Sequence, residues 1–136
     1  MSFTKFPTTY SGIQAAHALY SFAVDGGAVS TITPVVSDTI PINAIMVGGT
    51  VNSTTAVTSG GSATVAIGTS AGSSTTSILG ATAKASLSLN ALINAVPVFA
   101  TPVKLTAAGQ ITFTVGTAAL TAGIIEVWVF YVVSTN

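Results

Sequence analysis

The chain has few side chains that could take part in acid–base, nucleophilic or metal chemistry. Charged residues make up 4% of its 136 residues, against roughly 25% in an ordinary soluble domain. It contains neither Arg nor Cys, which excludes disulfides and thiolate metal sites. The side chains that carry charge or titrate near neutral pH are Lys5, Lys84, Lys104, Asp25, Asp38, Glu126 and His17. General acid–base catalysis needs positioned titratable groups, so this inventory argues against an enzyme.

Nucleophilic catalysis would have to use His17, the only imidazole in the chain. Asp25 or Asp38 could orient it, and any Ser could be nominated as the nucleophile, so the pattern is not specific. No Gly-x-Ser-x-Gly elbow is present. We interpret His17 as a polar contact of an N-terminal arm.

Glu126 is the most unusual of the three acids. It shares a strand face with Trp128 and Phe130, where an unpaired carboxylate is costly. Lys84 or Lys104 is therefore expected to pair with it, within the subunit or across an interface. We predict a structural ion pair here rather than a catalytic acid.

The sequence predicts no cofactor, no metal site, no nucleic-acid partner and no membrane partner. One His and scattered acids form no ligand cluster, and the Gly-rich stretches at 59–62 and 71–73 lack the Lys of a phosphate-binding loop. Three Lys balanced by three acids make no basic patch for phosphates. The longest apolar run, Ile124–Val133, contains Glu126 and is far shorter than the ~20 residues of a membrane helix.

Alternating apolar and polar residues predict short β-strands along most of the chain. They lie near 20–24, 29–33, 45–51, 63–67, 110–115 and 124–133, separated by Gly- and Pro-containing turns. Gly48-Gly49 within one strand indicates a bulge or a close backbone approach. The residues expected in the core are Phe22, Ile45, Val47, Val65, Ile67, Ile111, Phe113, Val115, Val127 and Val129. This pattern is typical of an all-β protein with a single antiparallel β-sandwich.

Residues 81–96 fit two interpretations. Ala85, Leu89, Leu92, Ile93 and Val96 follow a helical period, while Leu87, Leu89 and Ala91 fit a strand. We favour a short helix that begins near Ser86 or Ser88 and ends at Pro97.

The last strand is apolar on both faces, so it is expected to be central in its sheet or covered by another subunit. Net charge is zero and about half of the residues are apolar, which removes the repulsion that keeps monomers apart. We predict a homo-oligomer whose subunit interface includes Glu126, Trp128, Phe130 and Val132.

The first residues show no clear period and contain Pro7 and Gly12. We divide the chain into an N-terminal arm, residues 1–17, and a sandwich domain, residues 18–136. The arm carries Phe3, Phe6, Pro7 and Tyr10 and is expected to order on a partner, because segments without a core of their own often fold on binding.

Four stretches resemble small structural proteins of tailed phages. They share Pro-x-x-Ala-Ile before a strand, Ser-Ala-Thr-Val-Ala-Ile-Gly, and Leu-Thr-Ala-Gly before a terminal strand that ends in Tyr. The stretches are Ile40–Gly49, Thr58–Gly68, Ala107–Val115 and Leu120–Tyr131, and the resemblance covers residues 38–133. These motifs are architectural, so no functional residue is carried over.

The resemblance implies a jelly-roll-like sandwich that acts as a trimeric capsid decoration (cement) protein. Such a protein would be made in the host cytoplasm and would sit on the virion's capsid surface. There it would bridge neighbouring capsomers, with the arm docked on the major capsid protein. The alternative is a receptor- or glycan-binding module of a tail fibre or spike. That role favours aromatic side chains in loops, whereas Trp128 lies in a strand. A major shell subunit is a third reading, but one small sandwich leaves little sequence for lattice contacts.

Overall fold

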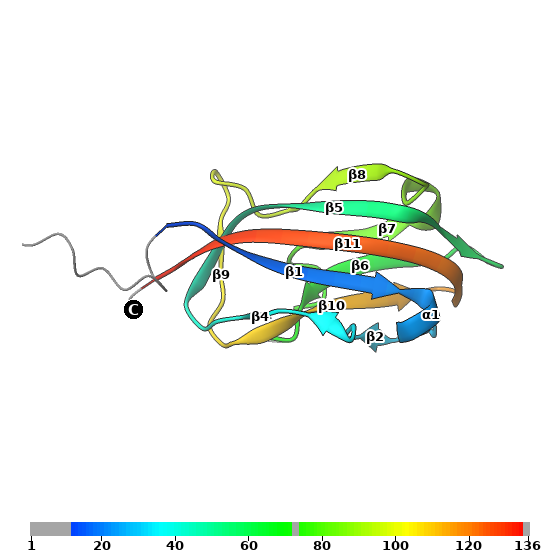
Figure 1. Cartoon of the computed structure of the whole chain (residues 1–136), viewed down its shortest axis with the longest axis horizontal. Helices are drawn as coiled ribbons and strands as arrows, with labels where there is room; N and C mark the ends of the chain where they lie inside the picture. Colours follow the sequence, from blue (N-terminus) through cyan, green and yellow to red (C-terminus); the bar gives the residue numbers. More distant parts are fainter. Residues whose placement is uncertain (1–11, 72–73, 135–136) are drawn as a thin grey trace, which may run out of the picture.

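The computed structural model describes residues 12–71 and 74–134, and it is an all-β sandwich, as predicted. Two antiparallel sheets pack face to face, and helix is confined to short turns. Figure 1 shows the six-stranded sheet in front of the five-stranded one. The front sheet has the order β3 (Val36–Ser37), β1 (Gln14–Ser21), β11 (Leu120–Val133), β5 (Ala44–Ser59) and β8 (Ala91–Asn94), and β9 (Val103–Lys104) also pairs with β5.

The back sheet has the order β2 (Thr31–Ile32), β10 (Gly109–Gly116), β6 (Thr64–Thr69) and β7 (Leu79–Ala83), and β4 (Thr39–Ile40) also pairs with β10. Four of the antiparallel pairs are nested along the chain: β1 with β11, β2 with β10, β5 with β8, and β6 with β7. The first strand thus pairs with the last, and successive nested pairs are distributed over the two sheets. This nested pairing is the jelly-roll arrangement.

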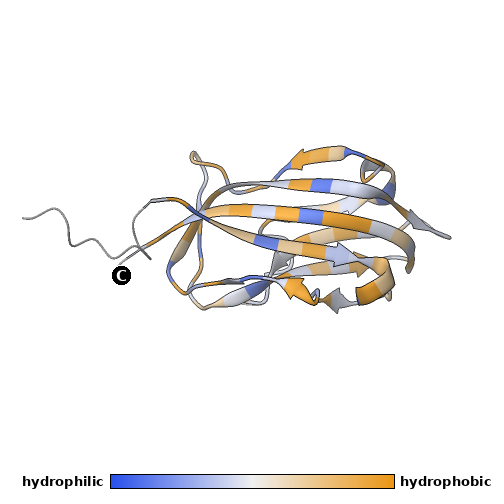
Figure 2. Cartoon of the chain, in the orientation of Figure 1, coloured by the Kyte–Doolittle hydropathy of each residue, from blue (hydrophilic) through white to orange (hydrophobic). Residues whose placement is uncertain are grey.

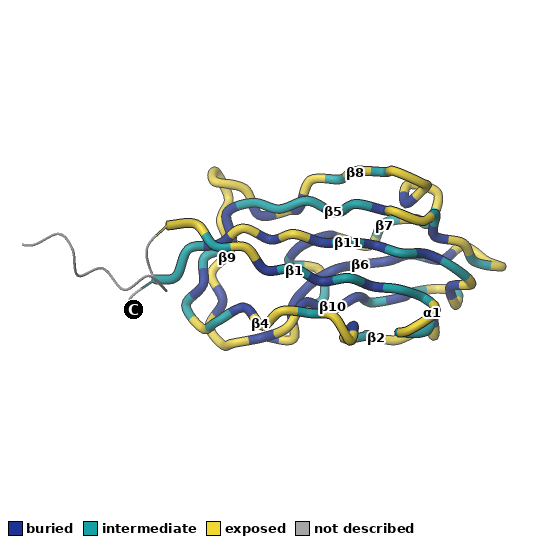
Figure 3. Tube along the Cα trace, in the orientation of Figure 1, coloured by how far each residue is buried: buried dark blue, intermediate teal, exposed yellow. Residues whose placement is uncertain are grey.

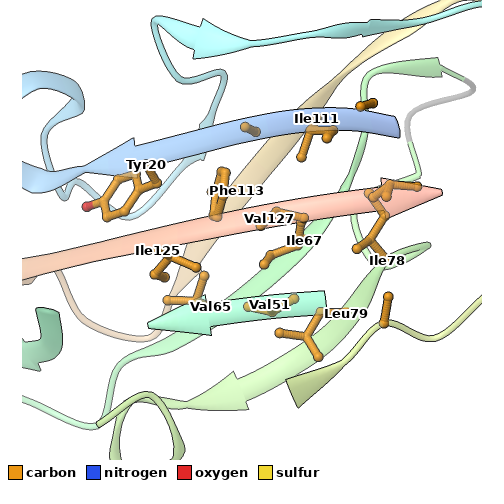
Figure 4. Packing of buried hydrophobic residues seen from close by; sticks show 14 of the residues in the cluster. Tyr20, Val51, Val65, Ile67, Ile78, Leu79, Ile111, Phe113, Ile125 and Val127 are labelled. Atoms are coloured by element: carbon orange, nitrogen blue, oxygen red, sulfur yellow. The ribbon is translucent and has the colours of Figure 1, made fainter. Parts of the chain in front are cut away.

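The core lies between the two sheets (Figure 4). Tyr20, Ile67, Ile111, Phe113, Ile125 and Val127 are among its fully buried side chains. Each strand contributes every second residue, because side chains alternate across a sheet. Of the predicted core residues, Val47, Val65, Ile67, Ile111, Phe113, Val115, Val127 and Val129 are buried, and Phe22 packs against the core half-buried.

Ile45 was wrongly placed in the core, and the reason is a β-bulge. The register between β5 and β11 shifts between the pairs Met46–Tyr131 and Gly48–Phe130. Val47 is the extra residue, so the alternation changes phase there and Met46, rather than Ile45, points inward. Gly49 beyond the bulge also makes a close approach, since a Cβ there would lie 2.5 Å from the Trp128 carbonyl oxygen. Gly48-Gly49 thus marked both features that the sequence suggested.

The predicted helix within 81–96 is wrong. The segment instead holds the end of β7, a 3-10 turn η2 (Lys84–Ser86), and strand β8. Leu87 is buried and the Leu87 carbonyl accepts a hydrogen bond from the Val57 amide. Asn90, at φ 64°, turns the chain into β8. These apolar residues do not form a single helical stripe, because some are buried in the core and others lie on the outer surface.

The N-terminal part of the domain also differs from expectation. Strand β1 begins at Gln14, so residues 14–17 of the expected arm belong to the sheet. Its inward residues include Ala16 and Ala18, whose small side chains gave a weak strand signal. The expected strand at 20–24 instead ends at Ser21, and a helical turn α1 (Phe22–Asp25) follows. The Tyr20 hydroxyl closes this turn by donating a 2.6 Å hydrogen bond to the Gly26 carbonyl.

Candidate functional site

The outward face of the front sheet collects the side chains predicted to form an interface. β11 is central in this sheet, between β1 and β5. Its inward residues are buried, whereas Glu126, Trp128, Phe130 and Val132 lie on the outer side, exposed or half-buried. In Figure 2 apolar segments run along β11 and β8 at the front of the molecule. We call this the front face, and it consists of the outward residues of β3, β1, β11, β5 and β8.

Cross-strand register arranges the front face in rows. One row places His17 opposite Trp128, and Trp128 opposite Thr50. The His17 and Trp128 ring centroids are 4.3 Å apart with the planes tilted by 35°, so the two rings are in contact. In the next row Phe130 lies opposite Gly48. Trp128 and Phe130 remain 38% and 37% exposed, which leaves two large rings open to a partner.

The Glu126 row, on the other side of the Trp128 row, is apolar at both ends and polar in the middle. Glu126 lies opposite Leu19 on one side and Asn52 on the other. Val36 extends the row beyond Leu19, and Leu92 extends it beyond Asn52. Leu92 is 68% exposed. Sequence reasoning missed Leu92 because it was assigned to a helix, and Val36 because it lies outside the predicted strands.

The partner of Glu126 is His17, not Lys84 or Lys104 as expected. His17 Nε2 lies 3.0 Å from Glu126 Oε2. The Lys84 ammonium instead donates a 2.7 Å hydrogen bond to the Ser59 carbonyl. His17 is therefore a strand residue that satisfies the one carboxylate on the front face. Its position in the sequence gave no sign of this, because the pairing of β1 with β11 joins opposite ends of the chain.

The other two acids have structural roles. Asp25 accepts hydrogen bonds from the Ser21 amide at 2.9 Å and the Val35 amide at 3.0 Å, which fixes the turn after β1. Asp38 Oδ2 accepts one from the His17 amide at 2.8 Å. Burial, and secondarily the charge of Asp25, raises the pKa of Tyr20 to about 12. Burial, and secondarily the charge of Asp38, raises the pKa of Tyr131.

A second exposed apolar surface borders the front face at its edge and shares Leu92 with it. We call residues 89–99 the edge segment; it contains β8 and the chain after it. Five large apolar side chains are exposed on it: Leu89, Leu92, Val96, Val98 and Phe99. Ala95 within it is buried and holds the segment against the sheet. Figure 3 shows β8 and the following loop at the upper edge of the molecule with long exposed stretches.

The outer side of the back sheet carries a cleft of about 300 Å³ lined by Thr31, Thr33, Thr69, Ser70, Thr75 and Thr112. Thr112 is 2% exposed, and its hydroxyl has no hydrogen-bond partner among the described residues. The lining side chains offer hydroxyl and methyl groups but no charge. The cleft therefore suits water or a small uncharged polar molecule.

Two other classes of site were sought within the described residues. No group of three or more His, Asp or Glu side chains comes together there in a way that could hold a metal ion. No helix in residues 12–71 or 74–134 is long and apolar enough to cross a membrane. The arm residues Phe3, Phe6, Pro7 and Tyr10 lie outside the described residues.

Comparison with known proteins gives relatives by structure alone. No family model matches the chain, and no curated protein matches it. Its fold is similar to that of a chain in the cyanophage Pam1 capsid asymmetric unit, with a TM-score of 0.66, 14% identity, and coverage of 98% of this chain and 93% of that one.

Two further capsid structures contain similar chains. One is the acidic stable capsid of Helicobacter pylori bacteriophage KHP30, with a TM-score of 0.63, 14% identity, and coverage of 91% and 90%. The other is the capsid of Ralstonia phage GP4, with a TM-score of 0.61, 14% identity, and coverage of 99% and 93%. The matches span nine-tenths or more of both chains in each case, so the shared fold extends over almost the full length of each pair.

Proposed function

We propose that this chain is a structural virion protein that decorates a phage capsid and stabilises it by bridging neighbouring capsomers. The observation that carries the proposal is the near-complete structural match to chains of three phage capsids. Because the match covers more than nine-tenths of two of those chains, their size is close to that of this protein. A protein of one small sandwich suits an accessory role better than the formation of a whole shell.

The described surface agrees with a role in assembly. The front face offers Trp128, Phe130 and flanking aliphatic side chains, and the single carboxylate on it is paired with His17. Exposed apolar area of this kind on a soluble protein usually marks an interface. We assign Glu126, Trp128, Phe130 and Val132 to contacts between copies of this chain in a homo-oligomer, with a trimer as the expected state.

The arm supplies the second contact in this proposal. Phe3, Phe6, Pro7 and Tyr10 give it four apolar or ring side chains in a short stretch, enough to anchor it on the major capsid protein. In this proposal the protein is made in the host cytoplasm and lies on the outer surface of the virion. The role is non-enzymatic, since each described acid is used in a structural hydrogen bond or ion pair.

Shell binding tests the proposal directly. Purified protein is mixed with shells assembled from the major capsid protein of the same virus, and bound copies are measured by sedimentation and by thermal resistance of the shells. The full chain is expected to bind and to raise the disruption temperature. Deletion of residues 2–11, which leaves β1 intact, is expected to abolish binding without changing the fold. The control Gly80→Ala, where an added Cβ meets nothing within 4 Å, should bind normally, and equal binding by the arm deletion would refute the docking role.

The runner-up is a receptor- or glycan-binding module of a tail fibre or spike. The hydroxyl-lined cleft with the unsatisfied Thr112 hydroxyl is the one observation in its favour. A glycan array, repeated with Thr112→Val, separates the two roles. Glycan binding that this substitution removes, together with absence of shell binding, would favour the runner-up.

A further inference from the structure

The molecule exposes two apolar surfaces that differ in shape and chemistry. The front face is a sheet surface on which two large rings, Trp128 and Phe130, are partly covered by neighbouring strands. The edge segment, residues 89–99, carries side chains that stand away from the sheet, of which Phe99 is 74% exposed. One surface offers ring faces and the other offers a projecting ring. Aromatic pairs favour offset or edge-to-face contact between such groups.

Strand β8 itself carries neither Lys nor Pro, and the Pro of the edge segment, Pro97, lies three residues beyond the end of the strand. β8 pairs with β5 on one side, and among the described strands none lies on its other side. Natural edge strands are usually protected by Lys, Pro or inward-pointing charges. β8 consists of Ala-Leu-Ile-Asn, and the sequence carries no charge between Lys84 and Lys104. Another polypeptide can therefore pair with the outer backbone groups of β8 and bury its apolar side chains.

The lack of unpaired charge on the front face and the edge segment indicates which partner covers them. The front face has one carboxylate, Glu126, which His17 already pairs at 3.0 Å. A strongly charged partner would lose solvation on either surface without gaining an opposite charge. A second copy of this chain presents a neutral apolar counterpart to each surface at the same time. Both surfaces can therefore be buried by self-association at little electrostatic cost.

We propose that the edge segment of one protomer packs on the front face of the next, with Phe99 against the rings of Trp128 and Phe130. This rests on the self-association in the proposed function and specifies its geometry. The two contacting patches are different, so the interface is heterologous, and such interfaces generate closed rings when the rotation closes. A ring with few members, such as a trimer, leaves no edge segment or front face unused.

Complementation between two broken protomers tests this geometry. Phe99→Lys breaks the edge segment and keeps the front face, while Trp128→Lys does the reverse. Both side chains are exposed enough to be replaced without loss of fold, and circular dichroism checks this. Native mass spectrometry of each variant alone is expected to show monomer. The mixture is expected to give a one-to-one heterodimer that does not grow, because one intact edge meets one intact face.

A matched control and a second measurement complete the test. Val24→Lys replaces a 66% exposed residue of α1 outside both surfaces and should keep the wild-type oligomer. Photo-crosslinking from benzoylphenylalanine at position 99, which keeps an aromatic ring, is expected to reach β1 or β11 of another protomer. This crosslinking measurement also tests the proposed contact if either Lys variant is unfolded.

Several results would overturn the geometry. A monomeric wild type, an oligomeric Phe99→Lys variant, or a mixture that stays monomeric would each do so. Dissociation by Trp128→Lys alone would instead indicate a symmetric contact between two front faces. Shell binding is measured separately, so the proposed function can stand while this arrangement fails, and the reverse is also possible.

Discussion

At the scale of single residues, the packing of the front sheet depends on positions without a side chain as well as on the side chains themselves. Gly48 and Gly49 are neighbours in β5, yet their surroundings differ. A Cβ at Gly49 would lie 2.5 Å from the Trp128 carbonyl oxygen and 3.0 Å from Ala95 Cβ, whereas one at Gly48 would meet Phe130 Cδ2 at 3.7 Å. An added side chain therefore has no room at Gly49, whereas at Gly48 it would lie at ordinary contact distance.

Gly49→Ala is therefore expected to destabilise the protein by about 1–3 kcal/mol, the usual cost of overpacking. Gly48→Ala should be neutral or slightly stabilising, because Gly costs backbone entropy in a strand. Urea unfolding of both variants, with Gly80→Ala in open space as a second control, measures the difference. Equal stability of the Gly48 and Gly49 variants would show that the close approach does not constrain the sheet.

Tyr20 gives a prediction in alkaline solution. Burial raises its pKa to about 12 in the folded chain, while an unfolded Tyr titrates near 10. The unfolded state therefore loses its proton first as the pH rises, and the stabilising contribution that is complete below pH ~10 is lost as the pH approaches ~12. The free energy of unfolding should fall by on the order of 2 kcal/mol over this interval.

Tyr20→Phe is the matched control, because it keeps the ring contact with Phe113 and removes the proton. Its unfolding free energy should depend less on pH between 10 and 12, with a remainder from Tyr131, whose pKa is also raised. An identical alkaline loss in the two proteins would mean that Tyr20 is not responsible.

At the scale of elements, the sequence predicted strands where alternation was regular and failed where geometry changed its phase. β6 and β10 were found because Val65, Ile67, Ile111 and Phe113 alternate without interruption. Ile45 was misplaced because Gly48-Gly49 indicated a bulge or a close approach but not that Val47 is the extra residue. The helix expected within 81–96 is wrong because the apolar residues there are divided between the core and the exposed surface, and the sequence does not distinguish an exposed apolar residue from a buried one.

The entry into β8 depends on Asn90, which adopts φ 64°. Gly accepts this conformation freely and Asn tolerates it, whereas Ala pays roughly 1–2 kcal/mol in the left-handed region. Asn90→Ala should lower the free energy of unfolding by about 1 kcal/mol, while Asn90→Gly should leave it nearly unchanged. Denaturant unfolding compares the three proteins, and a harmless Asn90→Ala would show that the turn adopts another conformation.

At the scale of the whole molecule, sequence patterns indicated a sandwich but not which strands are neighbours. Pairing of β1 with β11 brings His17 to Glu126 across most of the chain, and no local pattern encodes such a contact. The same pairing places β11 in the centre of the front sheet. Its inner side is buried by the back sheet and its outer side remains open, so the central position expected for a doubly apolar strand is confirmed, while cover by another subunit stays a proposal. The open side is where we place assembly.

The central claim is that this protein belongs to the outer surface of a phage head, and its location in the virion tests that claim most directly. Cryo-electron microscopy of phage particles isolated from cells that produce this protein, together with copy-number measurement by quantitative mass spectrometry, gives the location. The account predicts many copies in regular positions over the shell, each spanning a junction between capsomers. A few copies confined to the tail tip, or absence from the particle, would contradict it.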